Sequence, residues 1–157
     1  MAKRCWKRVA PTSLRHALEL CKEHGRERRN LSVERIAERM GLTDHWTVYK
    51  WVQNGRIPAN MIRPFEEVCG VDFVTRWLAA SAGRLVINIP TGRNVTPTDI
   101  AELQARLNDA VGSLLTFHAG QAGATETLAA VEQAMAGLAW HRGTVAKHLQ
   151  PELEFQS

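Results

Sequence analysis

Apolar residues recur every three or four positions through the first 82 residues, which is the spacing of helices that bury one face. Residues 33–40 show it most clearly, with Val33, Ile36 and Met40 on one stripe behind a capping Ser32. This spacing and the turn residues between segments predict a series of short helices. We expect them at about 12–23, 33–40, 44–53, 56–70 (interrupted or restarted near Pro64 and ended by Gly70) and 73–83, where Asp72 can form the cap.

Glycines mark where several of these helices should end. Gly25 is expected to close the first helix, so that "GRERRN" (25–30) forms a charged loop. Gly41, Asn54-Gly55 and Gly70 follow the next three helices in the same way. The run "RLVINIP" (84–90) is rich in β-branched residues and is the one good strand candidate. Its partner would be the same strand of another subunit; the alternative is an extended linker.

The remainder of the chain predicts two long helices joined by a tight turn. Thr96, Pro97 and Asp99 form a good start signal for a helix that continues to about His118. A second helix should cover about 125–149, and apolar residues follow a heptad spacing in both. Such an antiparallel hairpin has too little core to be stable alone, so we expect it to form a dimer or tetramer. The expected contact residues are Leu103, Leu107, Leu114, Leu128, Val131, Met135, Leu138 and Val145.

Charge divides the chain at a similar place. Residues 1–63 hold 14 Lys/Arg against 6 Asp/Glu, a net charge of +8, whereas residues 64–157 hold 6 against 10, a net charge of −4. This asymmetry favours a polyanion as the partner of the first part only. We therefore expect a DNA-binding domain at 1–90 with a basic arm and the short β segment, and an oligomerisation hairpin at 96–150.

A helix-turn-helix pattern occupies the middle of the basic part. Ala37 is small where two helices would cross, Gly41 suits a turn with positive φ, and Val48 and Trp51 lie three apart on the next helix. We expect Val48 and Trp51 to pack inward, which leaves the opposite face free to enter a DNA major groove.

The segment "VYKWVQNGRIP" (48–58) resembles the Cro/repressor family of helix-turn-helix proteins, whose recognition helix commonly ends V-x-x-W-x-x-G-x-x-x-P. One departure is that Val48 lies seven positions after Gly41, whereas the family usually has six. After this domain come "FVTRWLAASAGRLVINIPTGR" (73–93) and an acidic, alanine-rich C-terminus. With this order of parts, the chain looks like CII-type phage regulatory proteins. That resemblance implies a mostly α-helical regulator of lysogeny promoters. It would act in the cytoplasm of a bacterial host, associated with the nucleoid, where activation would require contact with RNA polymerase.

The predicted DNA-contacting side chains lie on and around the third helix. Gln53 suits adenine and Lys50 suits guanine or phosphate, whereas a solvated helix face is the alternative for both. Trp46 would contact DNA or pack against the first helix. The full set is Thr43, His45, Trp46, Thr47, Tyr49, Lys50, Gln53, Asn54 and Arg56.

The first ten residues, "MAKRCWKRVA", read as a basic arm rather than a packed element. Its cations would enter a minor groove or neutralise phosphates; the alternative is a solvated tail. They are Lys3, Arg4, Lys7 and Arg8.

Other classes of function find little support. No catalytic or nucleotide-binding motif occurs, the three cysteines and six histidines lack metal-ligand spacing, and no apolar run is long enough to span a membrane. We expect neither an enzyme nor a metal or other cofactor. Two rivals remain: an architectural or recombination-directing DNA-binding factor, and an antirepressor-type protein-interaction module.

Overall fold

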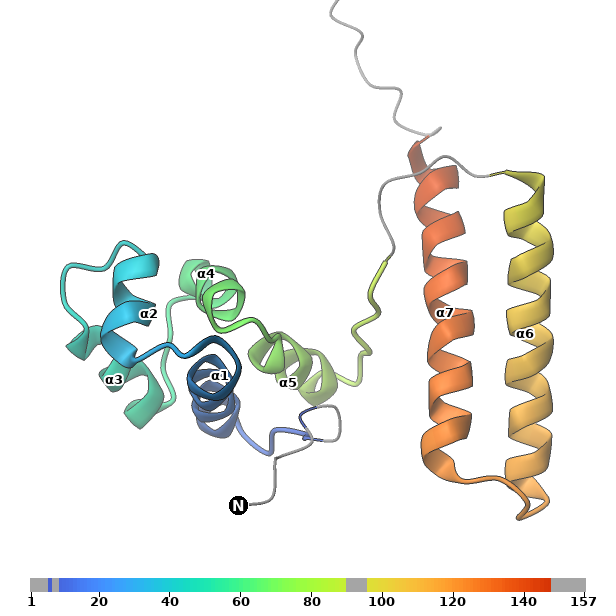
Figure 1. The fold of residues 1–157 in the computed structure, drawn as a ribbon, viewed down its shortest axis with the longest axis horizontal. Helices are drawn as coiled ribbons and strands as arrows, with labels where there is room; N and C mark the ends of the chain where they lie inside the picture. Colours follow the sequence, from blue (N-terminus) through green and yellow to red (C-terminus); the bar gives the residue numbers. More distant parts are fainter. Residues whose placement is uncertain (1–5, 7–8, 90–95, 148–157) are drawn as a thin grey trace, which may run out of the picture. The chain divides into compact units, whose positions relative to one another are not determined.

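The computed structural model of the protein describes residue 6, residues 9–89 and residues 96–147. These residues form seven α-helices, which confirms the mostly α-helical fold class. The chain divides into two compact units, Met1–Val86 and Ile87–Ser157 (Figure 1). The helices are α1 (Leu14–Arg29), α2 (Val33–Arg39), α3 (Trp46–Asn54), α4 (Ala59–Cys69) and α5 (Phe73–Ser81) in the first unit, then α6 (Pro97–His118) and α7 (Ala124–Lys147) in the second.

The predicted strand at 84–90 is not seen in the single chain. Residues 84–89 have no regular secondary structure, and residue 90 lies outside the described part of the chain. A β-strand needs a neighbour to accept and donate its backbone hydrogen bonds, and no other described segment is extended beside this one. The β-branched composition of the segment therefore does not make a strand within one chain.

The first helix is longer than predicted because Gly25 lies inside it. Gly25 is buried against α4, where a Cβ atom built on it would make an ordinary contact of 3.5 Å with the Cα of Cys69. The helix ends at Asn30, whose φ of 52° is left-handed. Residues 26–29 are helical rather than a loop. Arg29 at the end of α1 donates through Nη1 to the carbonyls of Glu67 and Val68, at 2.7 and 3.0 Å.

Helix α4 runs through Pro64 without the predicted interruption. Proline removes one helical hydrogen bond, and the carbonyl left without it belongs to the exposed Asn60, which water can reach. The following helix α5 begins after Asp72 as predicted, but the Asp72 side chain makes no capping bond. Instead the buried Glu66 accepts from the backbone N–H and the hydroxyl of Thr75, at 2.7 and 2.6 Å.

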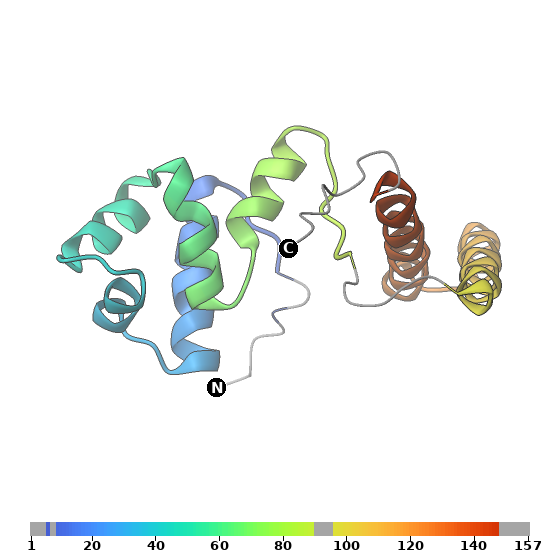
Figure 2. The same cartoon turned by 90° about the horizontal axis from the view of Figure 1, so that it is seen from above.

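The first unit has one hydrophobic core around α1, which lies between the α2–α3 pair and α5 (Figures 1 and 2). Trp51 is buried as predicted, beside fully buried Val48. Trp6 is buried as well, so this residue of the predicted arm packs into the core. Its Nε1 donates to Glu27 Oε2 at 3.1 Å, and its ring lies 5.1 Å from that of His24.

Two core cysteines make the unit sensitive to alkali. Burial, and next the charge of Glu66, raises the pKa of Cys21 to about 12, and burial, together with the nearby Cys21, also raises the pKa of Cys69. In the unfolded chain a thiol ionises near its ordinary pKa of about 8.5. Above that pH the unfolded state binds fewer protons than the folded state, so stability falls as pH rises toward about 12.

We expect the free energy of unfolding to drop between pH 8 and pH 10 by up to about 1.4 kcal/mol per thiol and pH unit. Urea titrations of the reduced protein at several pH values measure this drop. The variant Cys21→Ala/Cys69→Ala should lose less stability over the same interval, since its other titrating groups are unchanged. An equal pH slope in both proteins would show that the thiols do not cause it.

The second unit is an antiparallel pair of helices, seen nearly end-on in Figure 2. The predicted start signal of α6 is confirmed: Asp99 Oδ2 accepts from the backbone N–H and the hydroxyl of Thr96, both at 2.7 Å. The helix ends at His118, as expected. The predicted last residues of the second helix, 148 and 149, lie outside the described residues.

Candidate nucleic-acid interface and oligomerisation face

A short turn joins α2 to α3 and accommodates the extra residue noted in the sequence. Gly41 has a φ of 69°, and the N–H of Leu42 donates back to the carbonyl of Ala37 at 2.9 Å. Asp44 Oδ1 then accepts from the N–H of Trp46 at 2.9 Å. Helix α3 consequently begins at Trp46, two residues later than the predicted start near Asp44.

The inner side of α3 is firmly held by the core. Val48 and Val52 are buried, and so is Trp51. The end of the helix is fixed too, because Gly55 has a φ of 63° and a Cβ atom there would lie only 3.0 Å from Arg15 Cβ. A helix held in this way presents its outer side chains in one defined arrangement.

Four of the predicted contact residues share the outer side of α3. Trp46, Tyr49, Lys50 and Gln53 stand at positions i, i+3, i+4 and i+7, so they form one face, which we call the reading face. All four are exposed, with Trp46 59% and Tyr49 38% accessible. Lys50 forms no ion pair among the residues that the structure describes. The reading face therefore offers apolar, cationic and amide groups together.

Aromatic rings cluster at the N-terminal end of this face. The ring of Trp46 lies 5.4 Å from that of His45 and 5.5 Å from that of Tyr49. Trp46 thus contacts the rings of its neighbours while more than half of its surface remains exposed to solvent. Such ring pairs add about 0.5–1.5 kcal/mol beyond area burial, which helps to fix Trp46 in place while it stays exposed.

The other predicted contact residues either lie around the reading face or fall outside the described residues. Thr43, Asn54 and Arg56 are exposed at the two ends of α3, whereas His45 and Thr47 are half-buried. The arm residues Lys3, Arg4, Lys7 and Arg8 lie outside the described residues.

The hairpin buries small side chains and exposes large ones. Ala110, Thr127, Ala134 and Gly137 are buried between the helices, and a Cβ atom at Gly137 would lie 2.9 Å from Leu103 Cδ1. Of the eight predicted contact residues, Leu103, Leu107, Val131 and Met135 are half-buried, whereas Leu114, Leu128, Leu138 and Val145 are exposed by 41–65%. The exposed positions missed by the prediction include Val111 (56%) and Leu115 (67%).

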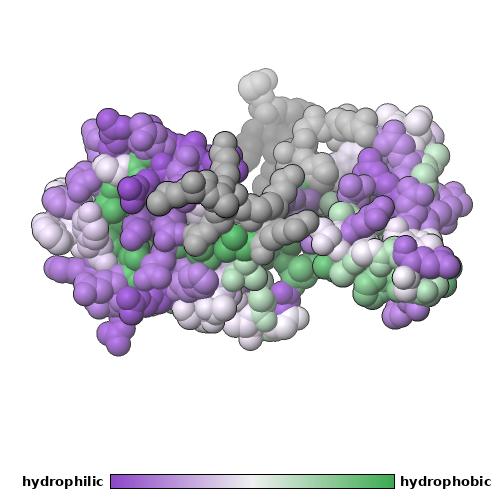
Figure 3. All heavy atoms as spheres, turned by 60° about the horizontal axis from the view of Figure 1, so that its bottom comes forward, coloured by the Kyte–Doolittle hydropathy of each residue, from purple (hydrophilic) through white to green (hydrophobic). Residues whose placement is uncertain are grey.

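One side of the hairpin carries four of these exposed apolar residues, Val111, Leu114, Leu128 and Leu138. On α6, Leu114 follows the buried Ala110 by four residues; on α7, Leu138 follows the buried Ala134 by four. On each helix, a step of four residues turns the side chain slightly past the side that contacts the other helix, and the sense of this rotation is the same for both helices. Because the helices are antiparallel, the same sense of rotation brings Leu114 and Leu138 to the same face of the hairpin. We call it the apolar face, and apolar surface on this unit is visible in Figure 3.

The members of the apolar face are the exposed or half-buried apolar residues that share this rotation. They are Ile100, Leu107, Val111 and Leu114 from α6, and Leu128, Val131, Met135 and Leu138 from α7. Contiguous apolar surface of this kind marks interaction sites in soluble proteins.

Comparison with known proteins adds no relative: no family model matches the chain, and neither a curated protein nor a solved structure resembles it significantly. The described residues contain no group of three or more His, Cys, Asp or Glu side chains arranged to hold a metal ion. No helix within the described ranges is long and apolar enough to cross a membrane.

Proposed function

We propose that the protein is a sequence-specific DNA-binding transcriptional regulator of phage or prophage type that binds operator or promoter DNA as an oligomer. The observation that carries this proposal is the reading face, because α3 is fixed by its buried side and exposes Trp46, Tyr49, Lys50 and Gln53 together. The helix also belongs to the basic part of the chain, whose residues 1–63 have a net charge of +8.

In this mechanism α2 and α3 act as a helix-turn-helix, and α3 enters the major groove. Gln53 would pair with the N6 and N7 of adenine, and Lys50 would donate to guanine or to a phosphate. Thr43, Asn54 and Arg56 at the ends of the helix would hold the DNA backbone and set its position. Sequence is read by the face of α3, and the flanking groups supply affinity.

The hairpin would bring two or more copies of α3 onto one DNA site. The apolar face of one subunit would cover that of another, which makes a four-helix arrangement from two hairpins. Two recognition helices about one DNA turn apart, roughly 34 Å, would then bind together. Because the two recognition helices are joined in one oligomer, two individually weak contacts with DNA give one tight complex. Repression requires only occupancy of the site, whereas activation requires a contact with RNA polymerase.

The double substitution Lys50→Ala/Gln53→Ala tests the assignment of the reading face. The test uses a duplex selected from a random pool by the unmodified protein. The variant should bind this duplex with about 2–6 kcal/mol less free energy, since each good base contact contributes roughly 1–3 kcal/mol. Fluorescence anisotropy with labelled duplex measures the affinity. Far-UV circular dichroism checks that the variant is folded.

The matched control is Arg84→Ala/Gln104→Ala, which removes one basic and one amide side chain from exposed positions outside α3. It should bind the selected duplex as tightly as the unmodified protein. Equal binding by the reading-face variant would contradict the role of α3.

One observation favours a second function. The exposed cluster of Trp46, Tyr49 and His45 would also suit a protein partner, because Trp and Tyr are enriched at the centres of protein interfaces. A protein-interaction module of the antirepressor type would keep its biological activity in the Lys50→Ala/Gln53→Ala variant and lose it in Trp46→Ala.

A further inference from the structure

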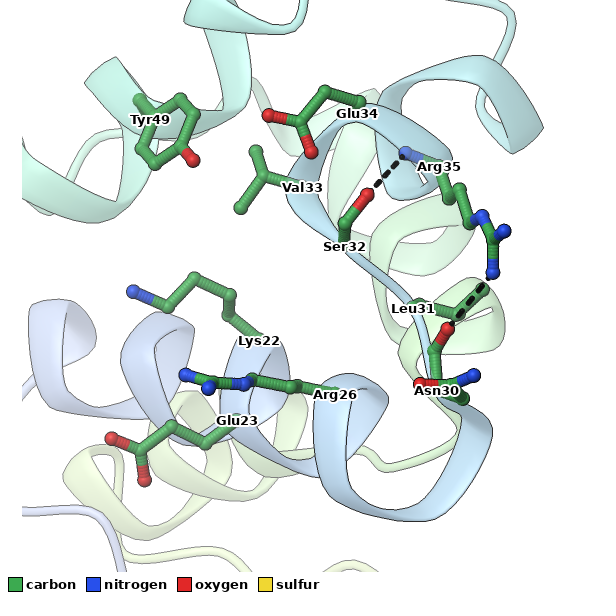
Figure 4. Close-up of a pocket in the computed structure, with 10 residues that line it drawn as sticks. All are labelled: Lys22, Glu23, Arg26, Asn30, Leu31, Ser32, Val33, Glu34, Arg35 and Tyr49. Atoms are coloured by element: carbon green, nitrogen blue, oxygen red, sulfur yellow. Dashed lines mark hydrogen bonds between the residues drawn. The ribbon is translucent and has the colours of Figure 1, made fainter.

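A groove of about 710 Å³ lies beside α3, between the C-terminal half of α1 and the start of α2 (Figure 4). Leu31 and Val33, both buried, line its base. Lys22 and Arg26 from α1 form one wall, and Tyr49 from α3 stands opposite. Because Tyr49 also belongs to the reading face, the groove continues the surface that we propose to bind DNA.

The two cations in this groove are available to an external anion. Within the part of the chain that the structure describes, neither Lys22 nor Arg26 has a carboxylate partner, whereas Arg15 on the same helix is paired with Glu19 at 3.2 Å. Figure 4 shows both charged groups along the α1 wall and the Tyr49 hydroxyl turned toward the groove. The groove thus combines two charged donors with one neutral donor.

The other charged residues at the groove limit the kind of anion it can hold. Arg35 is turned away and donates to the carbonyl of Asn30 at 3.3 Å. Glu23 already takes part in an interaction within the chain. Glu34 lies beside Tyr49, and hydrogen bonds from its own backbone N–H and from Ser32 lower its pKa, so it is ionised at neutral pH. These carboxylates disfavour a highly charged anion and leave room for a singly charged one on the α1 wall.

We propose that this groove holds one phosphodiester group of the DNA strand that borders the major groove occupied by α3. The inference rests on the proposed DNA binding. A helix in the major groove has a backbone strand on either side, and Tyr49 connects the helix directly to the groove. Lys22 and Arg26 neutralise the phosphate, and the hydroxyl of Tyr49 donates a hydrogen bond to it. These contacts fix the position of α3 on the duplex without reading sequence.

Salt dependence of binding distinguishes a phosphate contact from a general effect of charge. The logarithm of affinity falls with the logarithm of salt concentration in proportion to the number of neutralised phosphates. In Lys22→Gln/Arg26→Gln this slope should decrease by about one, because one phosphate is no longer neutralised. The preference for the selected duplex over a scrambled one should remain unchanged.

The control variant Arg28→Gln/Arg63→Gln removes the same net charge from exposed residues that do not line the groove. Its slope should equal that of the unmodified protein. If both double variants reduce the slope equally, the groove holds no phosphate and the proposal is overturned.

Neutral methylphosphonates placed one at a time in the selected duplex then locate the contact. At one phosphate the substitution should weaken binding of the unmodified protein and have no effect on Lys22→Gln/Arg26→Gln. Tyr49→Phe should weaken binding roughly five-fold through the loss of one hydrogen bond. If no position behaves in this way, or if the groove variant binds DNA normally but fails to regulate a promoter, the groove takes a different partner, such as an acidic protein segment. Absence of DNA binding by every version would instead refute the proposed function itself.

Discussion

Replacing Trp6 with alanine is expected to lower the free energy of unfolding of the first unit by about 3–5 kcal/mol. Its side chain is only 7% exposed and packs against His24 and Phe73. Removal leaves a cavity and also leaves Glu27 without the indole N–H. Domains of this size are stable by about 5–15 kcal/mol, so the variant would lose a large part of the total.

Urea denaturation followed by far-UV circular dichroism measures this change, since the chain holds four other tryptophans that complicate fluorescence. Trp6→Phe is the matched control: it keeps a ring against His24 and Phe73 and removes the indole N–H and part of the packing volume, so it should lose distinctly less. A loss below about 1 kcal/mol in Trp6→Ala would mean that residue 6 does not contribute to the core.

Two carboxylates on the apolar face are expected to separate the subunits. Leu114→Asp/Leu138→Asp places a charge on each helix of the hairpin at positions that are 41% and 47% exposed in the single chain. In the proposed assembly these positions would be covered by the second subunit, and an unpaired buried charge costs several kcal/mol. The dissociation constant should rise by a factor of at least about one hundred.

Analytical ultracentrifugation measures the result, with a monomer mass of 17.5 kDa as the reference. Ala105→Asp/Ala129→Asp is the matched control, because it adds the same two charges to exposed positions on the other side of the two helices. The control should retain the oligomeric mass of the unmodified protein. A monomeric unmodified protein, or an oligomer that tolerates Leu114→Asp/Leu138→Asp, would contradict the assignment of this face.

Local signals in the sequence predicted those features that depend on neighbouring residues. The cap formed by Thr96 and Asp99, the start of α2 after Ser32 and the turn at Gly41 all rest on hydrogen bonds or backbone angles within a few residues. Burial of Trp51 followed from its position three residues after Val48, since a helix places both on one side.

Tertiary contacts decided the features that local signals could not predict. A glycine often marks the end of a helix, but Gly25 lies inside α1 and is buried beside Cys69, and the buried side of α1 outweighs the low helix propensity of glycine. Trp6 follows a basic stretch, and only the tertiary positions of α1 and α5 give it a core to join. The groove that holds Lys22 and Arg26 is formed by three helices, so no single segment of sequence could indicate it.

The hairpin shows a limit of heptad spacing. The pattern correctly indicated two long helices, but it could not tell which of the apolar residues face the other helix of the same chain. Small residues such as Ala110 and Gly137 allow the two helices to approach, so larger ones such as Leu114 point outward. Some residues predicted to hold subunits together therefore help to hold the hairpin itself.

The most direct test of the account is the affinity of the unmodified protein for its selected duplex and for a scrambled duplex, each at several salt concentrations. We expect preferential binding of the selected duplex, by a factor of roughly one thousand or more, and a steep decrease of both affinities as salt increases. Equal affinity for the two duplexes would mean that the protein binds DNA without sequence specificity. No binding of either duplex at low salt would contradict the claim that α3 reads DNA.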